Sequence, residues 1–314
     1  MQKMTITGEF SKEVLDALAS WDKLIPTLYF LDICVISHIK DFQAGVDLSE
    51  HKQQIIAQIS RIDLAHNGIS YLAALVEKAS DQMNLMTTEE LITQANLDIF
   101  AIQRFFKEAR LIEMPRFIHE FIRSLKGEHP ELLGSSYHMF LQFANASGIH
   151  NTAAPSKRIS VAKMLCEKAV ELGIPKQHPV VLTTLACVYG SIPAKKVMKL
   201  KQNPREFNSS NALGDILFAQ RFGKYRQAIE AVSSLEGRFV RSDFVTSDQY
   251  LQTFISYFDF QEVLTQDSDD SSTDQFTVAI KANGLFPVLY NENNELVNES
   301  ELLKLYELLE YSTM

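Results

Sequence analysis

The chain of 314 residues lacks several features that mark whole classes of proteins. It has only three cysteines, Cys34, Cys166 and Cys187, which lie far apart and form no C-x-x-C pair. This scarcity argues against a disulfide framework and a structural zinc site, and it favours a reducing, cytoplasmic compartment. Glycine and proline are also sparse, at 12 and 9 copies, which argues against a fibrous or a disordered chain.

Long apolar runs and an excess of positive charge are absent as well. No stretch of about 18 apolar residues occurs, and no basic segment followed by an apolar run opens the chain. We therefore expect neither a membrane span nor a signal peptide. The net charge of −9 and the pI near 5.4 argue against a broadly basic nucleic-acid-binding surface, although a local basic patch stays compatible with them.

The chain does contain enough apolar material for a sizeable core, with 46% hydrophobic residues. Two apolar runs lead to an acid: LYFL at 28–31 precedes Asp32, and FV, at the end of a strand expected over 238–245, precedes Thr246-Ser247-Asp248. Such runs are typical of buried parallel strands, and we expect an α/β fold. Ligands of open α/β sheets bind beyond the carboxyl ends of the strands. Two such strands in one sheet would bring both acids to the same edge.

The middle of the chain is expected to be mostly helical. Apolar residues recur about every 3.6 positions over 82–175, which is the period of an amphipathic helix. The polar stretch 145–157 is the best loop candidate within it. Residues 179–200 are also expected to be helical, with a strand over 180–189 as the open alternative.

The last third of the chain carries weaker signals. The acidic, serine-rich segment 265–275 indicates a mobile loop. Segments 276–284 and 286–290 have the composition of two late strands, which would form a hairpin. The final helix is expected to begin near Asn298, with Glu301 three residues later as a capping-box partner.

Two further acids interrupt apolar helical stretches. Glu77 lies in SYLAALVEK and Asp215 lies in NALGDILFA. A buried carboxylate needs a partner, and neither stretch offers a lysine or arginine on the same apolar face. A divalent ion that prefers oxygen ligands, Mg²⁺ or Mn²⁺, would relieve the mutual repulsion of gathered carboxylates. Such an ion also activates water and stabilises charge on a phosphodiester.

The order and local contexts of these four acids resemble those of PIN-domain nucleases. In that family an apolar strand ends in Asp, a helical Glu and a helical Asp follow, and a later strand ends in Thr-x-Asp. The matching residues are Asp32 in YFLDICVI, Glu77 in ISYLAALVEK, Asp215 in NALGDILFA, and Thr246 and Asp248 in FVTSDQYLQTF. The matching segments are roughly 27–80 and 205–260, and the spacing between Glu77 and Asp215 is longer than in a compact PIN domain.

The resemblance implies a three-layer α/β/α domain with a central, mostly parallel sheet and a large helical insertion. Residues 1–81 would form the first part of this domain, 82–175 the helical insertion, and 176–314 the second part with C-terminal strands and a helix. PIN-like proteins mostly act on RNA, some cut structured DNA, and many belong to bacterial toxin or defence systems. A protein inhibitor or a second copy of the chain would be a further partner, and no membrane is implied.

The resemblance also implies catalytic and metal-binding roles for the four acids. Asp32 and Asp248 would bind one or two Mg²⁺ or Mn²⁺ ions directly, and Asp215 would be shared or bind through water. Glu77 would hold a second ion or orient the attacking water. Thr246 would position the final acid.

Basic and polar neighbours of these acids carry two interpretations each. A basic cluster precedes the Asp215 helix and is either a solvated face or a phosphate-tracking surface; it consists of Lys195, Lys196, Lys199, Lys201 and Arg205. Asn211, one turn before Asp215, either starts its helix or orients the acid. His38 and His66 lie near candidate acids in sequence and could support them.

Other interpretations of the same acids remain open at this point. Asp32 and Asp248 could simply cap the helices that follow their strands, and Glu77 could face solvent near its helix end. A phosphatase of the haloacid dehalogenase type would need a second Asp two residues after Asp32, where Cys34 stands instead. The remaining alternative is an inactive PIN-like scaffold that binds a protein partner through its helical insertion.

Overall fold

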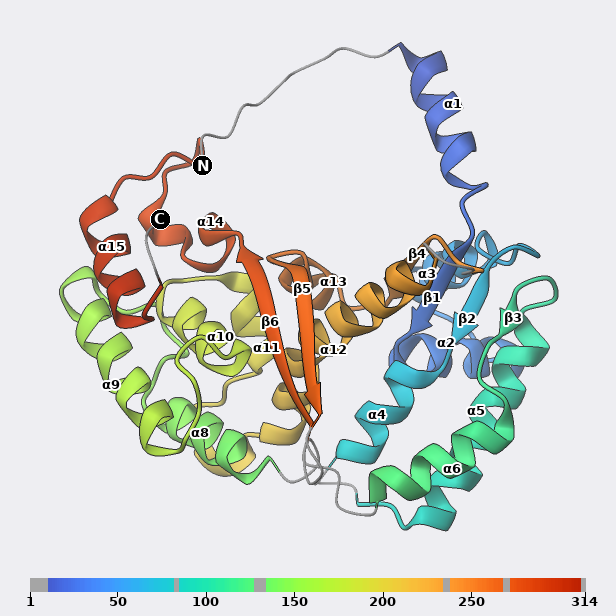
Figure 1. Ribbon diagram of the computed structural model, residues 1–314, viewed down its shortest axis with the longest axis horizontal. Helices are drawn as coiled ribbons and strands as arrows, with labels where there is room; N and C mark the ends of the chain where they lie inside the picture. The colour runs from blue at the N-terminus through green and yellow to red at the C-terminus, as the bar shows by residue number, and fades with distance from the viewer. Residues whose placement is uncertain (1–10, 82–84, 127–133, 234–237, 268–271, 312–314) are drawn as a thin grey trace.

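A four-stranded sheet lies at the centre of the computed structural model, which describes residues 11–81, 85–126, 134–233, 238–267 and 272–311 (Figure 1). The strand order is β3-β2-β1-β4, and every neighbouring pair is parallel. The bounds are β1 Thr27–Leu31, β2 Gly68–Ser70, β3 Arg110–Leu111 and β4 Arg241–Val245. The expected α/β protein with a parallel sheet is therefore confirmed.

The pairing of β1 with β4 decides where the acids lie. The register runs from Thr27 opposite Arg241 to Leu31 opposite Val245. The backbone N–H of Asp32 continues it by donating to the carbonyl oxygen of Val245 at 3.0 Å. Both strands therefore end at the same edge of the sheet, as their apolar runs predicted.

Helices cover both faces of the sheet, and the central strand β1 is apolar on both sides. Leu28 and Phe30 of β1 belong to one core, and Leu31 belongs to the other. The second core includes residues of five helices: α2 Ile33–Gln43, α3 Glu50–Ser60, α4 Leu72–Ser80, α5 Thr88–Phe105 and α6 Pro115–Lys126. The short helix α1, Lys12–Asp22, extends away from this body (Figure 1).

The first core is built from the later helices, which form the left-hand side of Figure 1. It includes residues of α8 Ser135–Ala146, α9 Arg158–Glu171, α10 Pro179–Val188, α11 Ile192–Met198, α12 Ser209–Ser233, α13 Gln249–Ile255, α14 Ala282–Leu285 and α15 Glu299–Leu308. The segment 180–189 is thus helical apart from Tyr189, and the strand alternative is wrong. Asn298 accepts a hydrogen bond from the Glu301 backbone N–H at 3.2 Å, which confirms the predicted start of the last helix.

Part of the expected helical insertion contributes to the sheet. β3 lies within residues 82–175 and pairs with β2, so this range is mostly but not wholly helical. No strand was expected from the sequence at β2 or at β3. Both strands are very short, and their extended form depends on their neighbours in the sheet.

The late hairpin also differs from the expectation. β5, Phe258–Asp267, pairs antiparallel with β6, Ser272–Ile280, so all described residues of the expected loop 265–275 are strand. Residues 268–271 lie outside the described ranges. The first expected late strand is confirmed over 276–280, which belong to β6. Residues 282–285 form α14 and 287–289 a 3-10 helix, so the second strand and the hairpin with it are wrong. Polar strands form here because cross-strand pairing supplies their hydrogen bonds.

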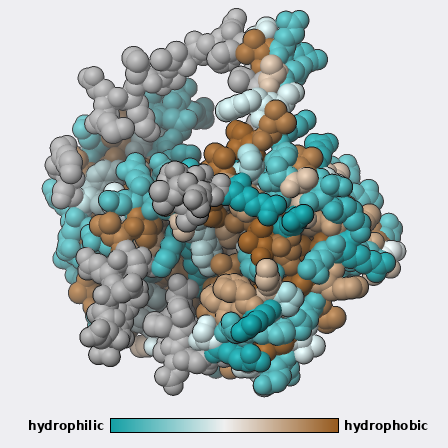
Figure 2. All heavy atoms as spheres, turned by 45° about the vertical axis from the view of Figure 1, so that its right-hand side comes forward, coloured by the Kyte–Doolittle hydropathy of each residue, from teal (hydrophilic) through white to brown (hydrophobic). Residues whose placement is uncertain are grey.

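Hydrophobic residues also reach the surface of the molecule. Figure 2 shows brown side chains between teal hydrophilic ones on the face turned toward the viewer. Phe100 of α5 is 63% exposed and Met114 is 74% exposed. Among the described residues, no helix combines the length and the apolar character that crossing a bilayer requires.

A buried carboxylate joins the helices that follow β1 and β2. Asp98 of α5 is fully buried and forms ion pairs with Lys40 of α2 and Lys78 of α4. It also accepts hydrogen bonds from the Tyr71 hydroxyl at 2.8 Å and from the Gln94 amide at 3.0 Å. These contacts hold α2 and α4 in place, and burial of the charge is offset by its four partners.

Asp98→Ala should lower the free energy of unfolding by about 3–5 kcal/mol, because it leaves two ammonium groups near the core without their partner. Asp41→Ala provides the matched control. It breaks the partly exposed pair of Asp41 on α2 with Lys52 on α3, which should cost far less because solvent screens exposed ion pairs. Urea denaturation measures both. Equal losses in the two variants would contradict a structural role for the Asp98 cluster.

Candidate functional site

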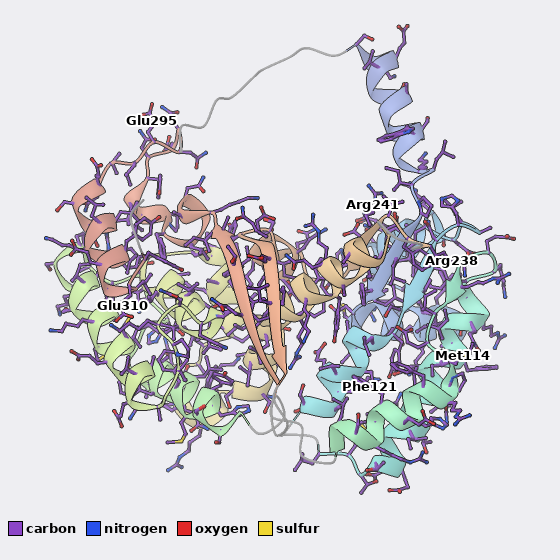
Figure 3. The ribbon with its side chains drawn as sticks, viewed as in Figure 1. Met114, Phe121, Arg238, Arg241, Glu295 and Glu310 are labelled. Carbon is purple, nitrogen blue, oxygen red and sulfur yellow. The ribbon has the colours of Figure 1, made fainter. Side chains whose placement is uncertain are left out.

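A pocket of about 620 Å³ lies at the carboxyl edge of the sheet, and all four candidate acids line it. They are Asp32, Glu77, Asp215 and Asp248. The remaining lining residues come from α2, α3, α11, α12 and α13 or their ends; they are Ile33, Cys34, His51, Lys199, Asn211, Ser247, Gln249, Tyr250 and Leu251. Figure 3 shows Arg238 and Arg241 near the start of β4, which is the opposite end of that strand.

Thr246 connects the two acids that follow the strands. Its hydroxyl donates to Asp32 Oδ2 at 2.5 Å and accepts from the backbone N–H of Asp248 at 3.0 Å. It therefore fixes the Asp32 carboxylate and the loop that carries Asp248 at once. This position agrees with the predicted supporting role of Thr246.

The capping interpretation holds for one of these two acids. Asp248 Oδ1 accepts from the backbone N–H groups of Tyr250 and Leu251 at 2.9 and 3.0 Å, so Asp248 caps α13. Asp32 precedes α2 but makes no side-chain capping bond. Its Oδ2 instead accepts from Thr246 and from the Cys34 thiol, the latter at 2.9 Å.

Glu77 and Asp215 reach the pocket from two helices that lie close together. Gly214 of α12 lies beside the Glu77 side chain of α4: a Cβ atom at this position would be in ordinary contact with Glu77 Cγ, at 3.6 Å. Asp215 is only 8% exposed. Glu77 lines the pocket, so the interpretation that it faces open solvent at its helix end does not describe its position.

Burial and mutual repulsion change the titration of both acids. Burial, followed by repulsion from Asp32 and Asp215, raises the pKa of Glu77 to about 8. Burial raises the pKa of Asp215 to about 6, although the neighbouring Lys199 ammonium acts in the opposite direction. The pocket therefore holds carboxyl groups whose ionised forms are unfavourable without an added positive charge.

Lys199 supplies one such charge from α11. Its Nζ donates to Asp215 Oδ2 at 2.7 Å and to Asn211 Oδ1 at 2.9 Å. Asn211 thus lies at the start of α12 and also helps to hold the cation beside Asp215. This ion pair across helices was not visible from the local sequence around Asp215, because 16 residues separate the partners.

The structure separates the predicted basic cluster. Lys199 lines the pocket, and Lys196 Nζ lies 5.4 Å from the centre of the Tyr250 ring, which lines it too. Lys195 donates to the Thr152 hydroxyl at 2.8 Å and does not line the pocket. Lys201 and Arg205 are exposed on the connection to α12, outside the pocket lining.

Several residues at the site carried no functional prediction. Burial and the Asp32 charge raise the pKa of the Cys34 thiol to about 12, so it stays protonated and donates to Asp32. His51 of α3 approaches the Ser247 carbonyl oxygen at 3.3 Å. The two histidines considered as supports lie elsewhere: His38 is buried on α2, and His66 contacts the Lys23 carbonyl oxygen before the start of β1.

The donor set suits a hard divalent ion, but the side chains are not arranged around one. Carboxylate oxygens are the ligands that Mg²⁺ and Mn²⁺ prefer. Among the described residues, no three His, Cys, Asp or Glu side chains form a group that could hold a metal ion as they stand. Thr246 donates to one oxygen of Asp32, and Lys199 donates to one oxygen of Asp215. The α13 backbone donates to one oxygen of Asp248. Metal binding would therefore require these carboxylates to close on the ion.

Comparison of the chain with protein-family models, with curated proteins and with solved structures found no match. The function of the chain is therefore inferred from the pocket and its residues.

In the absence of metal, the free energy of unfolding should fall as the pH rises from about 4.5 to 8, because the folded Glu77 and Asp215 hold protons that the unfolded chain has lost. The stabilisation is complete below the unfolded pKa and is lost through the raised, folded pKa. Glu77→Gln should make this decline shallower. Urea denaturation at pH 5 and pH 8.5 in EDTA measures the difference between the two proteins.

Comparing the wild type with Glu77→Gln separates the effect of Glu77 from that of groups whose titration changes stability in the opposite direction. Burial lowers the pKa of His178 to about 4, which favours the folded state as the pH rises. An identical pH dependence in the wild type and in Glu77→Gln would contradict the raised pKa of Glu77.

Proposed function

We propose that the chain is a divalent-metal-dependent nuclease of PIN-like type that hydrolyses phosphodiester bonds. We propose RNA rather than DNA as its substrate. The PIN resemblance suggests that the protein acts as a toxin or defence effector. The observation that carries the proposal is the presence of four acids from four separate segments in one pocket at the carboxyl edge of the sheet. Four separate helix caps or surface acids would have no reason to share this pocket.

The position of each acid suggests its role in the reaction. Asp32 and Asp248 follow adjacent strands and would hold the first Mg²⁺ or Mn²⁺ ion, with Asp215 as a shared or water-mediated ligand. Glu77, with its raised pKa, would hold a second ion or accept a proton from the attacking water. When bound, the ion lowers the pKa of a water molecule and stabilises charge on the phosphate.

The reaction itself requires few covalent steps. A water molecule adds to phosphorus, the bond from phosphorus to the leaving oxygen breaks, and that oxygen takes up a proton. Because phosphoryl transfer depends mainly on positioning and charge, a pocket of fixed acids suits it. Tyr250 lines the pocket and Lys196 lies beside its ring, and both would contact the neighbouring nucleotides of the substrate.

Asp248→Asn and Asp215→Asn should each lower the rate of cleavage of labelled RNA at least about a hundredfold, because each removes a ligand charge. Asparagine also caps helices well, so Asp248→Asn should keep α13 intact. Cleavage is followed on gels with Mg²⁺ or Mn²⁺ and with EDTA. Asp47→Asn, an exposed acid outside the pocket, is the control. Full activity in either pocket variant would refute these assignments.

An inactive PIN-like scaffold is the second candidate, and two observations favour it. Lys199 already neutralises Asp215, and no ligand group is formed among the described acids. Exposed apolar residues of the range 82–175, such as Phe100, would then bind a protein partner. Figure 3 shows Met114 and Phe121 at the α5–α6 end of the molecule, away from α11.

Binding of Mn²⁺ separates the two candidates. Calorimetry should detect Mn²⁺ binding to the wild type, and Mn²⁺ at a hundred times its Kd should stabilise the fold by about 2.7 kcal/mol. Asp32→Asn should remove both effects, because it deletes one ligand charge and disturbs the bond from Thr246. The absence of Mn²⁺ binding, or binding that Asp32→Asn leaves unchanged, favours the scaffold.

A further inference from the structure

Lys199 has an unusual backbone conformation at the end of α11. Its φ of 50° and ψ of 36° lie in the left-handed region, which glycine normally occupies at a helix C-terminus. For a residue with a side chain this conformation is sterically unfavourable. The turn aims the chain from α11 toward α12, and the side chain of Lys199 lies in the acidic pocket.

The ammonium group of Lys199 is held by two partners and has one donor to spare. An ammonium has three N–H bonds. One goes to Asp215 Oδ2 and one to Asn211 Oδ1, which lie one turn apart on α12. The Lys199 side chain is 37% exposed, whereas that of Asp215 is 10% exposed, so the ammonium lies toward the open side of the acid.

The third N–H group of Lys199 is important because the pocket around it is acidic. Among the described residues, Lys199 is the one lysine or arginine that lines the pocket, against four acids. A phosphodiester carries a negative charge and would be repelled by ionised carboxylates at close range. A fixed cation beside the acids offsets this repulsion at the point where the phosphate must enter.

We propose that Lys199 is a further catalytic residue, whose ammonium binds a non-bridging oxygen of the scissile phosphate. Asn211 and Asp215 are its positioning residues, in addition to the role of Asp215 toward the metal ion. This inference rests on the proposed nuclease function. It differs from a purely structural ion pair, in which Lys199 would serve only to neutralise Asp215.

The two roles predict different effects on substrate binding. In EDTA, Lys199→Met should weaken the binding of a fluorescein-labelled single-stranded RNA about tenfold, measured by anisotropy. Its plot of log Kd against log salt concentration should lose about 0.7 in slope, the value for one phosphate contact on a single strand. Lys195→Met is the matched control. It removes the same charge from the same helix, one turn earlier and outside the pocket lining.

The two roles also predict different effects on the reaction. With Mn²⁺, Lys199→Met should lower kcat/KM about a hundredfold, and Lys199→Arg should restore part of it. Calorimetry should show that Lys199→Met binds Mn²⁺ at least as tightly as the wild type, since a competing cation has left Asp215. Weaker Mn²⁺ binding together with unchanged RNA binding would overturn the proposal in favour of a structural pair.

A second pair of variants tests the phosphate contact even if Lys199→Met alone does not fold. Asp215→Asn removes the carboxylate that is ion-paired with Lys199, so the double variant Asp215→Asn with Lys199→Met leaves no charged partner of that pair behind and should remain folded. RNA binding in EDTA should be weaker in the double variant than in Asp215→Asn alone. Equal binding in these two proteins would overturn the phosphate contact.

The outcomes for the two proposals remain distinguishable. If the wild type cleaves RNA with Mn²⁺ and Lys199→Met matches Lys195→Met in both kcat/KM and RNA binding, only the role of Lys199 fails. If the wild type neither binds Mn²⁺ nor cleaves nucleic acid, the nuclease function fails, and the role of Lys199 fails with it.

Discussion

The parallel pairing of β1 with β4 is the constraint on which the site depends. Because the register places Leu31 opposite Val245, Asp32 and the Thr246–Asp248 turn must leave the sheet at one edge. Thr246 then joins both acids through a single hydroxyl. A shift of one residue in this register would exchange the two faces of β4 and place Phe244 and Val245 each against the opposite core.

The pocket presents an energetic problem that the surrounding structure solves only in part. Carboxyl groups of Glu77 and Asp215 are buried near other acids, and their pKa values are raised for that reason. Lys199 offsets the charge of one of them, and Cys34 and Thr246 donate to Asp32. The buried Asp98 presents the reverse case, an acid with enough cations around it. The contrast indicates that the pocket is short of positive charge, whereas the core beneath it is not.

Much of the site could be predicted because its signals are local. An apolar run followed by Asp32, and the VTSD segment before α13, point to strand ends, and parallel strand ends meet at one edge. Asp215 was marked by its apolar neighbours. The pairing of Lys199 with Asp215 could not be predicted, because the two residues come from different helices. Similarly, β2 and β3 are too short to show a period, and the adjoining ends of β5 and β6 are polar enough to resemble a loop.

The sequence by itself determined the order of helices and main strands, and it determined which acids had no local partner. These properties follow from the period of apolar residues and from the chemistry of neighbouring side chains. Only the tertiary structure decided that the four acids share a pocket, that Asp248 also caps α13, and that a lysine from α11 lies among them. Such contacts join residues up to 214 positions apart, as Asp32 and Thr246 do. Chain folding, and not local preference, sets the distances between them.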